Sequence, residues 1–299
     1  MNVYLINHHV TYKTIKEHID SFIEVLKSND IPVRNLVVNN IIDTYNNYVK
    51  NVKNSILIIF YVSKHRLKYN DKIKTNDKGT NKILFFNTEQ INNSSKIKEF
   101  KTFNKIFDFE GVLDYDRQNI YNIKTHCDLP VFVIPFTYSS YLNKYNHRGE
   151  EYDVVFLGCK NRRRNNIIQK LQNKGLKVLY SDNIFSDRHN YYNNAKVVLD
   201  IQYFDSNHIP NIHRIVPCIY GKNIIISENL HLSGYEYIKD YAVSCNIDDM
   251  DEIVEKICLD YDIWYDKIFS NIDHCEINRE NKYYMDKFID YINIIKQNI

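Results

Sequence analysis

The chain has 299 residues, of which 14% are aromatic, and it contains only 7 glycines and 5 prolines. This length fits two domains of about 150 residues, each able to bury a core. Its 39 basic and 37 acidic residues leave a net charge of +2. That balance argues against a dedicated nucleic-acid binder, because such domains are strongly basic.

The 6 cysteines form no CxxC pair, so we expect reduced thiols and no zinc site. The longest apolar run, residues 56–62, is far shorter than the roughly 20 residues that span a bilayer. Residues 3–6 are too short for the apolar core of a signal peptide. We therefore expect a cytoplasmic protein without a transmembrane segment.

Short apolar runs alternate with helical spacing in the first half of the chain. Strands are predicted at residues 2–6, 33–38, 55–62, 83–86, 105–109 and 130–134. Helices are predicted at residues 11–28, near 41–52 and near 117–125, and a long polar loop at 63–81. This alternation is typical of a parallel sheet with helices on both faces.

A polar segment rich in tyrosine and asparagine, residues 138–151, is predicted to be a linker to a second series of the same kind. In that series, strands are predicted at residues 152–157, 176–180, 196–201, 223–227 and 241–245. Helices are predicted at residues 161–174, 187–194, 211–220, 249–269 and 278–297. The expected fold is α/β, with two doubly wound, Rossmann-like parallel-sheet domains facing a cleft. The expected domains are residues 1–145 and 146–275, with a final helix at 276–299 packing back on the first domain.

A basic run begins the first helix of the second domain. Gly158 follows a buried strand, and three arginines at 162–164 then open the helix. Cations at a helix amino end face an unfavourable dipole, which a bound diphosphate would relieve. The alternative is that these side chains extend into solvent and pair with Glu150 or Glu151.

A second candidate site lies between residues 205 and 228. His208, His213 and Arg214 lie where a polar loop enters a helix, and helix amino ends attract phosphate. Asn211 is a candidate cap of that helix. Glu228 follows the next strand, where a carboxylate can bind a ribose hydroxyl. The alternative is that these are ordinary surface residues, with Glu228 a solvated loop acid.

Two groups in the first domain are candidates for a general base. His8 follows the first strand, and a histidine has an ordinary pKa near neutrality. Glu89 also follows a strand and could serve as a base or bind an acceptor. Asp114 and Asp116 have a spacing that could ligate a divalent cation, or they could cap the helix that follows.

The order of these motifs resembles the GT-B glycosyltransferases, in particular a bacterial and viral group that use nucleotide sugars. That group reads roughly YN-x-EQ, DYS-x-x-N, P plus a tyrosine, DVxFxGxxxxRR, and RI before SE. The matching stretches here are residues 87–90, 114–119, 135–138, 153–158 with Arg162 and Arg163, 214–215 and 227–228.

The resemblance implies transfer of a sugar from a nucleotide-diphosphate sugar, with a UDP-sugar as the expected donor, to a glycan or glycoprotein acceptor. It implies no bound metal or other cofactor. Glu228 would bind the ribose, and the diphosphate would meet the remaining second-domain candidates, namely Gly158, Arg162, Arg163, His208, His213 and Arg214.

The chain departs from the family at two positions. Retaining members often carry acids where Tyr220 and Asn211 stand here, so the stereochemical outcome stays open. An inverting enzyme needs a base, which Glu89 or His8 could supply.

Two other functions stay open. One is a metal-dependent glycosyltransferase that uses Asp114 and Asp116. The other is a catalytically inert two-domain module that binds nucleotide or glycan. The AT-rich bias of the composition fits a large DNA virus, which would place the protein in the host cytoplasm or the virion. No nucleic-acid partner is expected, and a homodimer is an open alternative to a monomer.

Overall fold

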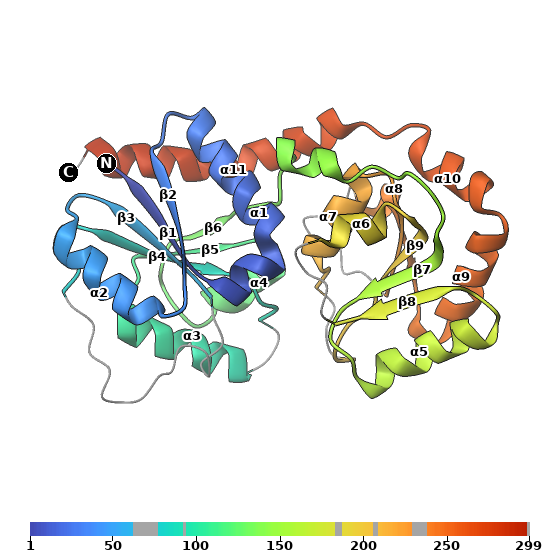
Figure 1. Ribbon diagram of the computed structural model, residues 1–299. Helices are drawn as coiled ribbons and strands as arrows, with labels where there is room; N and C mark the ends of the chain where they lie inside the picture. The colour runs from blue at the N-terminus through green and yellow to red at the C-terminus, as the bar shows by residue number, and fades with distance from the viewer. Residues whose placement is uncertain (62–76, 92–93, 183–186, 206–208, 229–237, 298–299) are drawn as a thin grey trace. The chain divides into compact units, whose positions relative to one another are not determined.

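The computed structural model describes residues 1–61, 77–91, 94–182, 187–205, 209–228 and 238–297. The chain forms two compact units, Met1–Thr137 with Arg279–Ile299, and Tyr138–Asn278 (Figure 1). The first division falls after Thr137 rather than after residue 145, and the chain returns to the first unit after Asn278 rather than after residue 275.

The first unit contains a six-stranded parallel sheet in the order β2-β1-β3-β4-β5-β6. Its strands are β1 (Val3–His8), β2 (Val33–Val38), β3 (Ile56–Phe60), β4 (Lys82–Asn87), β5 (Gly111–Asp114) and β6 (Val131–Val133). All five pairings are parallel, which confirms the predicted doubly wound sheet. In such sheets ligands bind beyond the carboxyl ends of the strands, where the strand order reverses.

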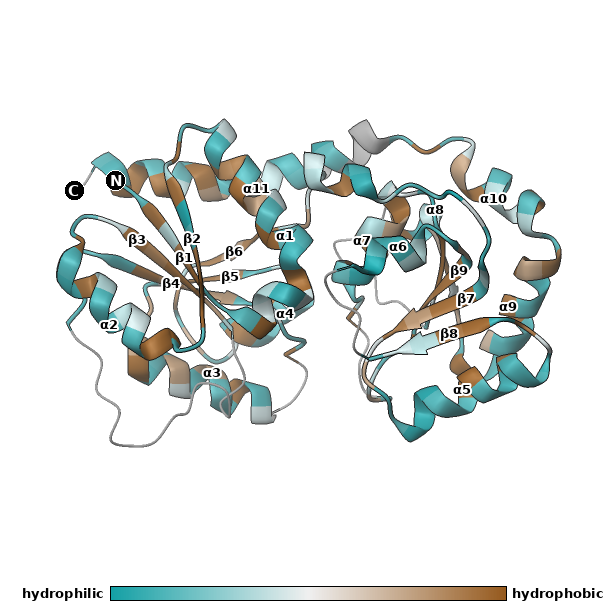
Figure 2. Cartoon of the chain, in the orientation of Figure 1, coloured by the Kyte–Doolittle hydropathy of each residue, from teal (hydrophilic) through white to brown (hydrophobic). Residues whose placement is uncertain are grey.

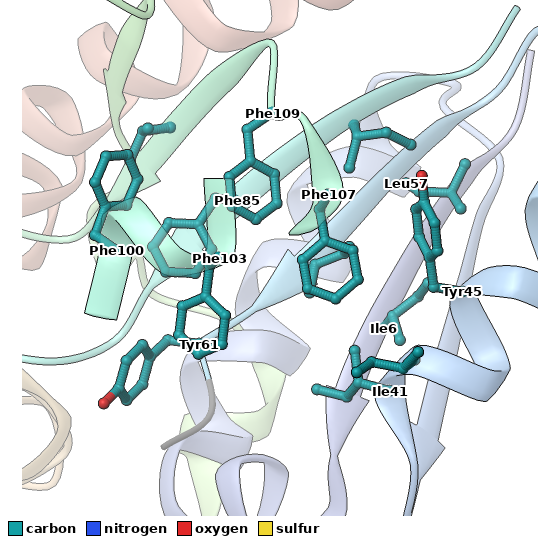
Figure 3. Close-up of a cluster of buried hydrophobic side chains, with 14 of the residues drawn as sticks. Ile6, Ile41, Tyr45, Leu57, Tyr61, Phe85, Phe100, Phe103, Phe107 and Phe109 are labelled. Carbon is teal, nitrogen blue, oxygen red and sulfur yellow. The ribbon is translucent and has the colours of Figure 1, made fainter. Parts of the chain in front are cut away.

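Helices cover both faces of this sheet. They are α1 (His9–Ser28), α2 (Ile41–Asn51), α3 (Ser94–Phe107), α4 (Arg117–Lys124) and α11 (His274–Gln297). Apolar residues of α2 and α3 pack on one face, around Phe85, Phe103 and Phe109 (Figure 3). Residues of α1 and α11, including Phe22 and Phe288, pack on the other face. The central strand β3, Ile-Leu-Ile-Ile-Phe, is buried throughout and wholly apolar, as expected for a strand covered on both faces (Figure 2).

The predicted strand at residues 105–109 is wrong, and helix α3 and strand β5 lie in this region instead. Ile97, Phe100, Phe103 and Phe107 recur at helical spacing and form the buried stripe of α3. The helix ends at Asp108, whose φ of 51° lies in the left-handed region. An aromatic-rich stretch resembles a strand by its composition, but the spacing of the aromatic residues here indicates a helix.

The second unit contains a five-stranded parallel sheet in the order β11-β10-β9-β7-β8. Its strands are β7 (Tyr152–Leu157), β8 (Val178–Ser181), β9 (Ala195–Asp200), β10 (Ile224–Glu228) and β11 (Ala242–Cys245). When the strands of each sheet are numbered along the chain, both sheets contain the order 2-1-3-4-5, which the first sheet extends by a sixth strand. The order reverses between β7 and β9, so the carboxyl ends of these two strands define the expected binding edge.

The second unit also has helices on both sides of its sheet (Figure 1). They are α5 (Arg162–Asn173), α6 (Arg188–Tyr192), α7 (Ile212–Tyr220), α8 (Ile238–Tyr241), α9 (Met250–Leu259) and α10 (Tyr261–Phe269). Two short 3-10 helices are η1 (Ser140–Lys144), within the predicted linker, and η2 (Ile247–Asp249). Among the described helices of both units, none combines the length and apolarity needed to cross a membrane.

Candidate functional site

The carboxyl edge of the second sheet contains a buried ion pair. Arg214, in the first turn of α7, donates one hydrogen bond to the carboxylate of Asp200 at the end of β9 and one of 2.8 Å to the carbonyl of Leu157 at the end of β7. The Ser227 hydroxyl donates to the other Asp200 oxygen at 3.0 Å. Burial opposes the charge on Arg214, but Asp200 and Tyr192 together outweigh it and raise the arginine pKa. Arg214 therefore ties together the two strands at which the order reverses.

Gly158 follows β7 and leaves room for this arginine. A Cβ atom at this position would lie 3.2 Å from Arg214 Nη2 and 3.2 Å from Phe156 Cζ. The guanidinium groups of Arg164 and Arg214 both lie over the Phe156 ring, 5.1 Å and 5.0 Å from its centroid. Burial, together with the charge of Arg214, lowers the pKa of Arg164 to about 10. The glycine thus permits two arginines to share one aromatic ring.

Side chains at the start of α5 donate hydrogen bonds to three successive backbone carbonyls of the loop that follows β9. Arg164 Nη2 donates to the carbonyl of Ile201 at 2.6 Å, and Arg163 Nη1 donates to that of Gln202 at 3.2 Å. Asn161 Nδ2 donates to the carbonyl of Tyr203 at 2.8 Å, while its Oδ1 caps the helix at the Arg164 amide. Much of the charge of the basic run is thus satisfied by the protein itself.

Glu228 ends β10 and is 7% exposed, so it is not a solvated loop acid. Arg163 donates hydrogen bonds to both oxygens of the Glu228 carboxylate. Its Nη2 donates to Oε1, and its Nη1 donates to Oε2 at 2.6 Å. The Gln202 amide adds a third donor to Oε2, at 3.2 Å. A carboxylate has about four acceptor positions, so the bonds from the described residues leave one on Oε1.

The remaining second-unit candidates differ in exposure. Arg162 is exposed and, within the described residues, makes no hydrogen bond or ion pair. His213 lies in the first turn of α7 and is 8% exposed. Asn211 occupies the N-cap position of α7, but its side chain makes no capping hydrogen bond, so the predicted side-chain cap is wrong. His208 lies outside the described residues.

Tyr220, which stands where the resemblance to GT-B glycosyltransferases led us to look for an acid, has a structural role. It ends α7, its hydroxyl donates to Asn278 Oδ1 at 2.9 Å, and its ring centroid lies 5.1 Å from that of Tyr138.

His8 and Glu89 both lie at the carboxyl edge of the first sheet. His8 is the last residue of β1, is 6% exposed, and accepts a 3.3 Å hydrogen bond from the Val10 amide on Nδ1. It therefore caps α1. Glu89 follows β4, and its side chain is 48% exposed, with a carboxylate oxygen 3.8 Å from Lys96 Nζ.

A buried amide–carboxylate network fixes the backbone of Glu89. Nδ2 of Asn87 and Nδ2 of Asn119 donate to the Glu89 carbonyl at 2.7 Å and 2.9 Å. The same two nitrogens donate to the Asp114 carboxylate at 2.7 Å and 3.0 Å. Asp116 accepts from the amides of the first turn of α4 and so caps that helix.

This network engages both acids of the candidate metal motif. Asp114 and Asp116 are 0% and 1% exposed, and the protein's own donors occupy both oxygens of Asp114 and Oδ1 of Asp116. Burial raises the pKa of Asp116 to about 6. In the described parts of the chain, no cluster of three or more His, Cys, Asp or Glu side chains is arranged to hold a metal.

Sequence reasoning missed Asp200 and Asn87 as parts of these sites. Asp200 closes an apolar strand, as Glu228 does, so a carboxylate at a strand's carboxyl end was the available signal. Asn87 likewise ends β4, and Asn119 lies in the first turn of α4.

No protein-family profile matches the chain. One curated relative, "Uncharacterized protein R358" of Acanthamoeba polyphaga mimivirus, is 29% identical over 220 residues, which cover 71% of this chain and 73% of that protein. Two solved glycosyltransferases superpose over the whole chain and 99% of their own, each at 10% identity. They are AviGT4, involved in avilamycin A biosynthesis, with a TM-score of 0.59, and an enzyme from Rickettsia africae ESF-5, with a TM-score of 0.58. The chain therefore has the two-unit parallel α/β fold of GT-B glycosyltransferases.

Proposed function

We propose that the chain is a glycosyltransferase that moves a sugar from a nucleotide-diphosphate sugar to a glycan or protein acceptor without a metal. The observation that carries this proposal is the carboxylate of Glu228, held at the carboxyl edge of the second sheet with one acceptor position that no described residue fills. A ribose hydroxyl is a suitable donor for that position. The fold shared with solved glycosyltransferases supports the same conclusion.

The second unit would bind the donor. Arg162 is exposed at the amino end of α5, where amide groups and the helix dipole favour an anion, and it is the first candidate for the diphosphate. Arg163 is half-buried between Glu228 and Asp205, and one of its guanidinium N–H groups could form a hydrogen bond to the leaving phosphate. Arg214 is buried against Asp200, so its part is to position Gly158 and the ends of β7 and β9.

The first unit would supply the acceptor side. In the transfer, the acceptor hydroxyl oxygen bonds to the anomeric carbon, and the bond from that carbon to the diphosphate oxygen breaks. The diphosphate leaves with the electron pair, and its negative charge is stabilised by the basic groups of the second unit. In an inverting reaction the hydroxyl proton would pass to Glu89 or His8. Glu89 is the stronger candidate, because its side chain is exposed while the network of Asn87 and Asn119 fixes its backbone.

Release of nucleoside diphosphate from uridine, guanosine, cytidine and thymidine diphosphate sugars tests the proposal. We expect release from at least one donor, undiminished by excess chelator and abolished by Glu228→Ala. Glu255→Ala is the matched control, because Glu255 is a half-exposed acid on α9 that pairs with Lys174. Loss of activity in chelator would show metal dependence. Binding of nucleotide without turnover of any donor would identify an inert binding module instead.

The mimivirus relative supports a viral setting for this activity, and we propose that the acceptor is a viral glycan or glycoprotein.

A further inference from the structure

Two adjacent aromatic side chains project from the loop that follows β9. Tyr203 is 40% exposed and Phe204 is 58% exposed. Their ring centroids lie 4.7 Å apart with planes at 79°, an edge-to-face arrangement. Single exposed aromatics are common on protein surfaces, so exposure alone would not mark a site. The position and support of this pair are what distinguish it.

The loop that carries the pair is firmly held. Its carbonyls at residues 201, 202 and 203 accept hydrogen bonds from Arg164, Arg163 and Asn161 in turn. The Arg164 guanidinium also lies over the Tyr203 ring, 5.2 Å from its centroid. Arg163 reaches past Gln202 to Asp205 as well. A ligand that meets a preorganised surface loses less free energy to the ordering of side chains.

The pair also adjoins the carboxylate assigned to the ribose. The amide of Gln202, the residue directly before Tyr203, donates to Glu228 at 3.2 Å. In a nucleotide the base is attached to the ribose carbon next to the 2′-hydroxyl. A ribose bound by Glu228 would therefore place its base close to residues 203 and 204.

We propose that Tyr203 and Phe204 form the surface on which the nucleobase of the donor stacks. The inference rests on the proposed function and assigns the base subsite within it. Stacking on an aromatic ring suits any base, because every base has a π-face. The surface thus contributes affinity for the nucleotide, while the contact of the ribose with Glu228 fixes the position of the nucleotide.

Isothermal titration of the full chain with uridine, guanosine, cytidine and thymidine diphosphates tests the assignment. For the tightest of the four, Tyr203→Ala and Phe204→Ala should each weaken binding about tenfold or more, the order expected for the loss of a base–aromatic stack. Tyr203→Phe and Phe204→Tyr should restore affinity to near the wild-type value. Tyr283→Ala is the control, because Tyr283 is 56% exposed on α11 and lies in the other unit.

The outcomes separate this inference from the proposed function. If the wild type binds a nucleoside diphosphate and both alanine variants bind it equally well, the base subsite is wrong while the donor site stands. If the alanine variants instead change the oligomeric state in size-exclusion chromatography and not the affinity, the pair is a contact between copies, and the inference is overturned. If the wild type binds none of the four, the proposed function fails and the subsite with it.

Discussion

Replacing Arg214 with methionine tests whether this arginine stabilises the second unit by connecting the ends of β7 and β9. The change removes one partner of an ion pair whose side chains are 8% and 1% exposed, and leaves Asp200 with the Ser227 hydroxyl as its remaining side-chain donor. Removing one partner of a buried pair typically costs about 3–5 kcal/mol of unfolding free energy. The lost hydrogen bond to Leu157 contributes about 1 kcal/mol of this.

The electrostatic part of this cost comes from the Asp200 carboxylate, which the substitution leaves buried without its cationic partner. Adding Asp200→Asn should recover part of the loss, because no charge is then buried alone.

The chain offers a local probe for this measurement. Its only tryptophan, Trp264, lies in α10 of the second unit, so its fluorescence during urea titration reports on the unit that contains Arg214. Lys170→Met is the control, because Lys170 is half-exposed and its partner Asp251 keeps a second lysine, which limits the expected cost to about 0.5 kcal/mol. A cost below about 1 kcal/mol for Arg214→Met would refute the reasoning, and so would a double variant with Asp200→Asn that is no more stable than Arg214→Met alone.

Three further predictions concern stability and catalysis. Burial lowers the pKa of His18 to about 4, so folding stability should fall as pH drops from about 6.5 to about 4, by up to about 3 kcal/mol, and urea titrations of His18→Gln should lack this dependence. Gly158→Ala should displace Arg214, cost about 1–3 kcal/mol by overpacking, and weaken nucleotide binding in calorimetry; unchanged affinity would contradict the proposed site. Asn119→Ala should lower kcat more than it raises the donor KM, because it loosens the Glu89 backbone without touching the donor side; an effect on donor KM alone would remove Glu89 from the reaction.

The sequence predicted both sheets because most of their strands stand out as short apolar runs, and inner strands such as β3 and β10 are buried along their whole length. Residues 33–38 and 152–157 were predicted with the observed bounds. The exception is α3, where closely spaced phenylalanines suggest a strand by composition although their spacing of three and four residues is helical. Periodicity was the better guide there.

Sequence reasoning placed residues at the carboxyl edge of the second sheet more accurately than it predicted the contacts that they make there. Residues at the ends of parallel strands meet at one edge, which brings Gly158, Arg214 and Glu228 into one region. The partners of the arginines depend on loop geometry that a pattern does not contain. The unfavourable charges at the start of α5 are compensated by backbone carbonyls and by Glu228, whereas the sequence suggested a bound anion or pairing with Glu150 or Glu151.

Calorimetry with a matched pair of ligands tests the central claim most directly. Uridine diphosphate and its 2′,3′-dideoxy analogue differ only in the two ribose hydroxyls, one of which Glu228 would bind. If uridine diphosphate is the donor nucleotide, the wild type should bind it about 10- to 100-fold more tightly than the analogue, as expected for a hydrogen bond to a charged group, while Glu228→Ala should bind the two alike. A preference for uridine diphosphate that persists in Glu228→Ala would contradict the account.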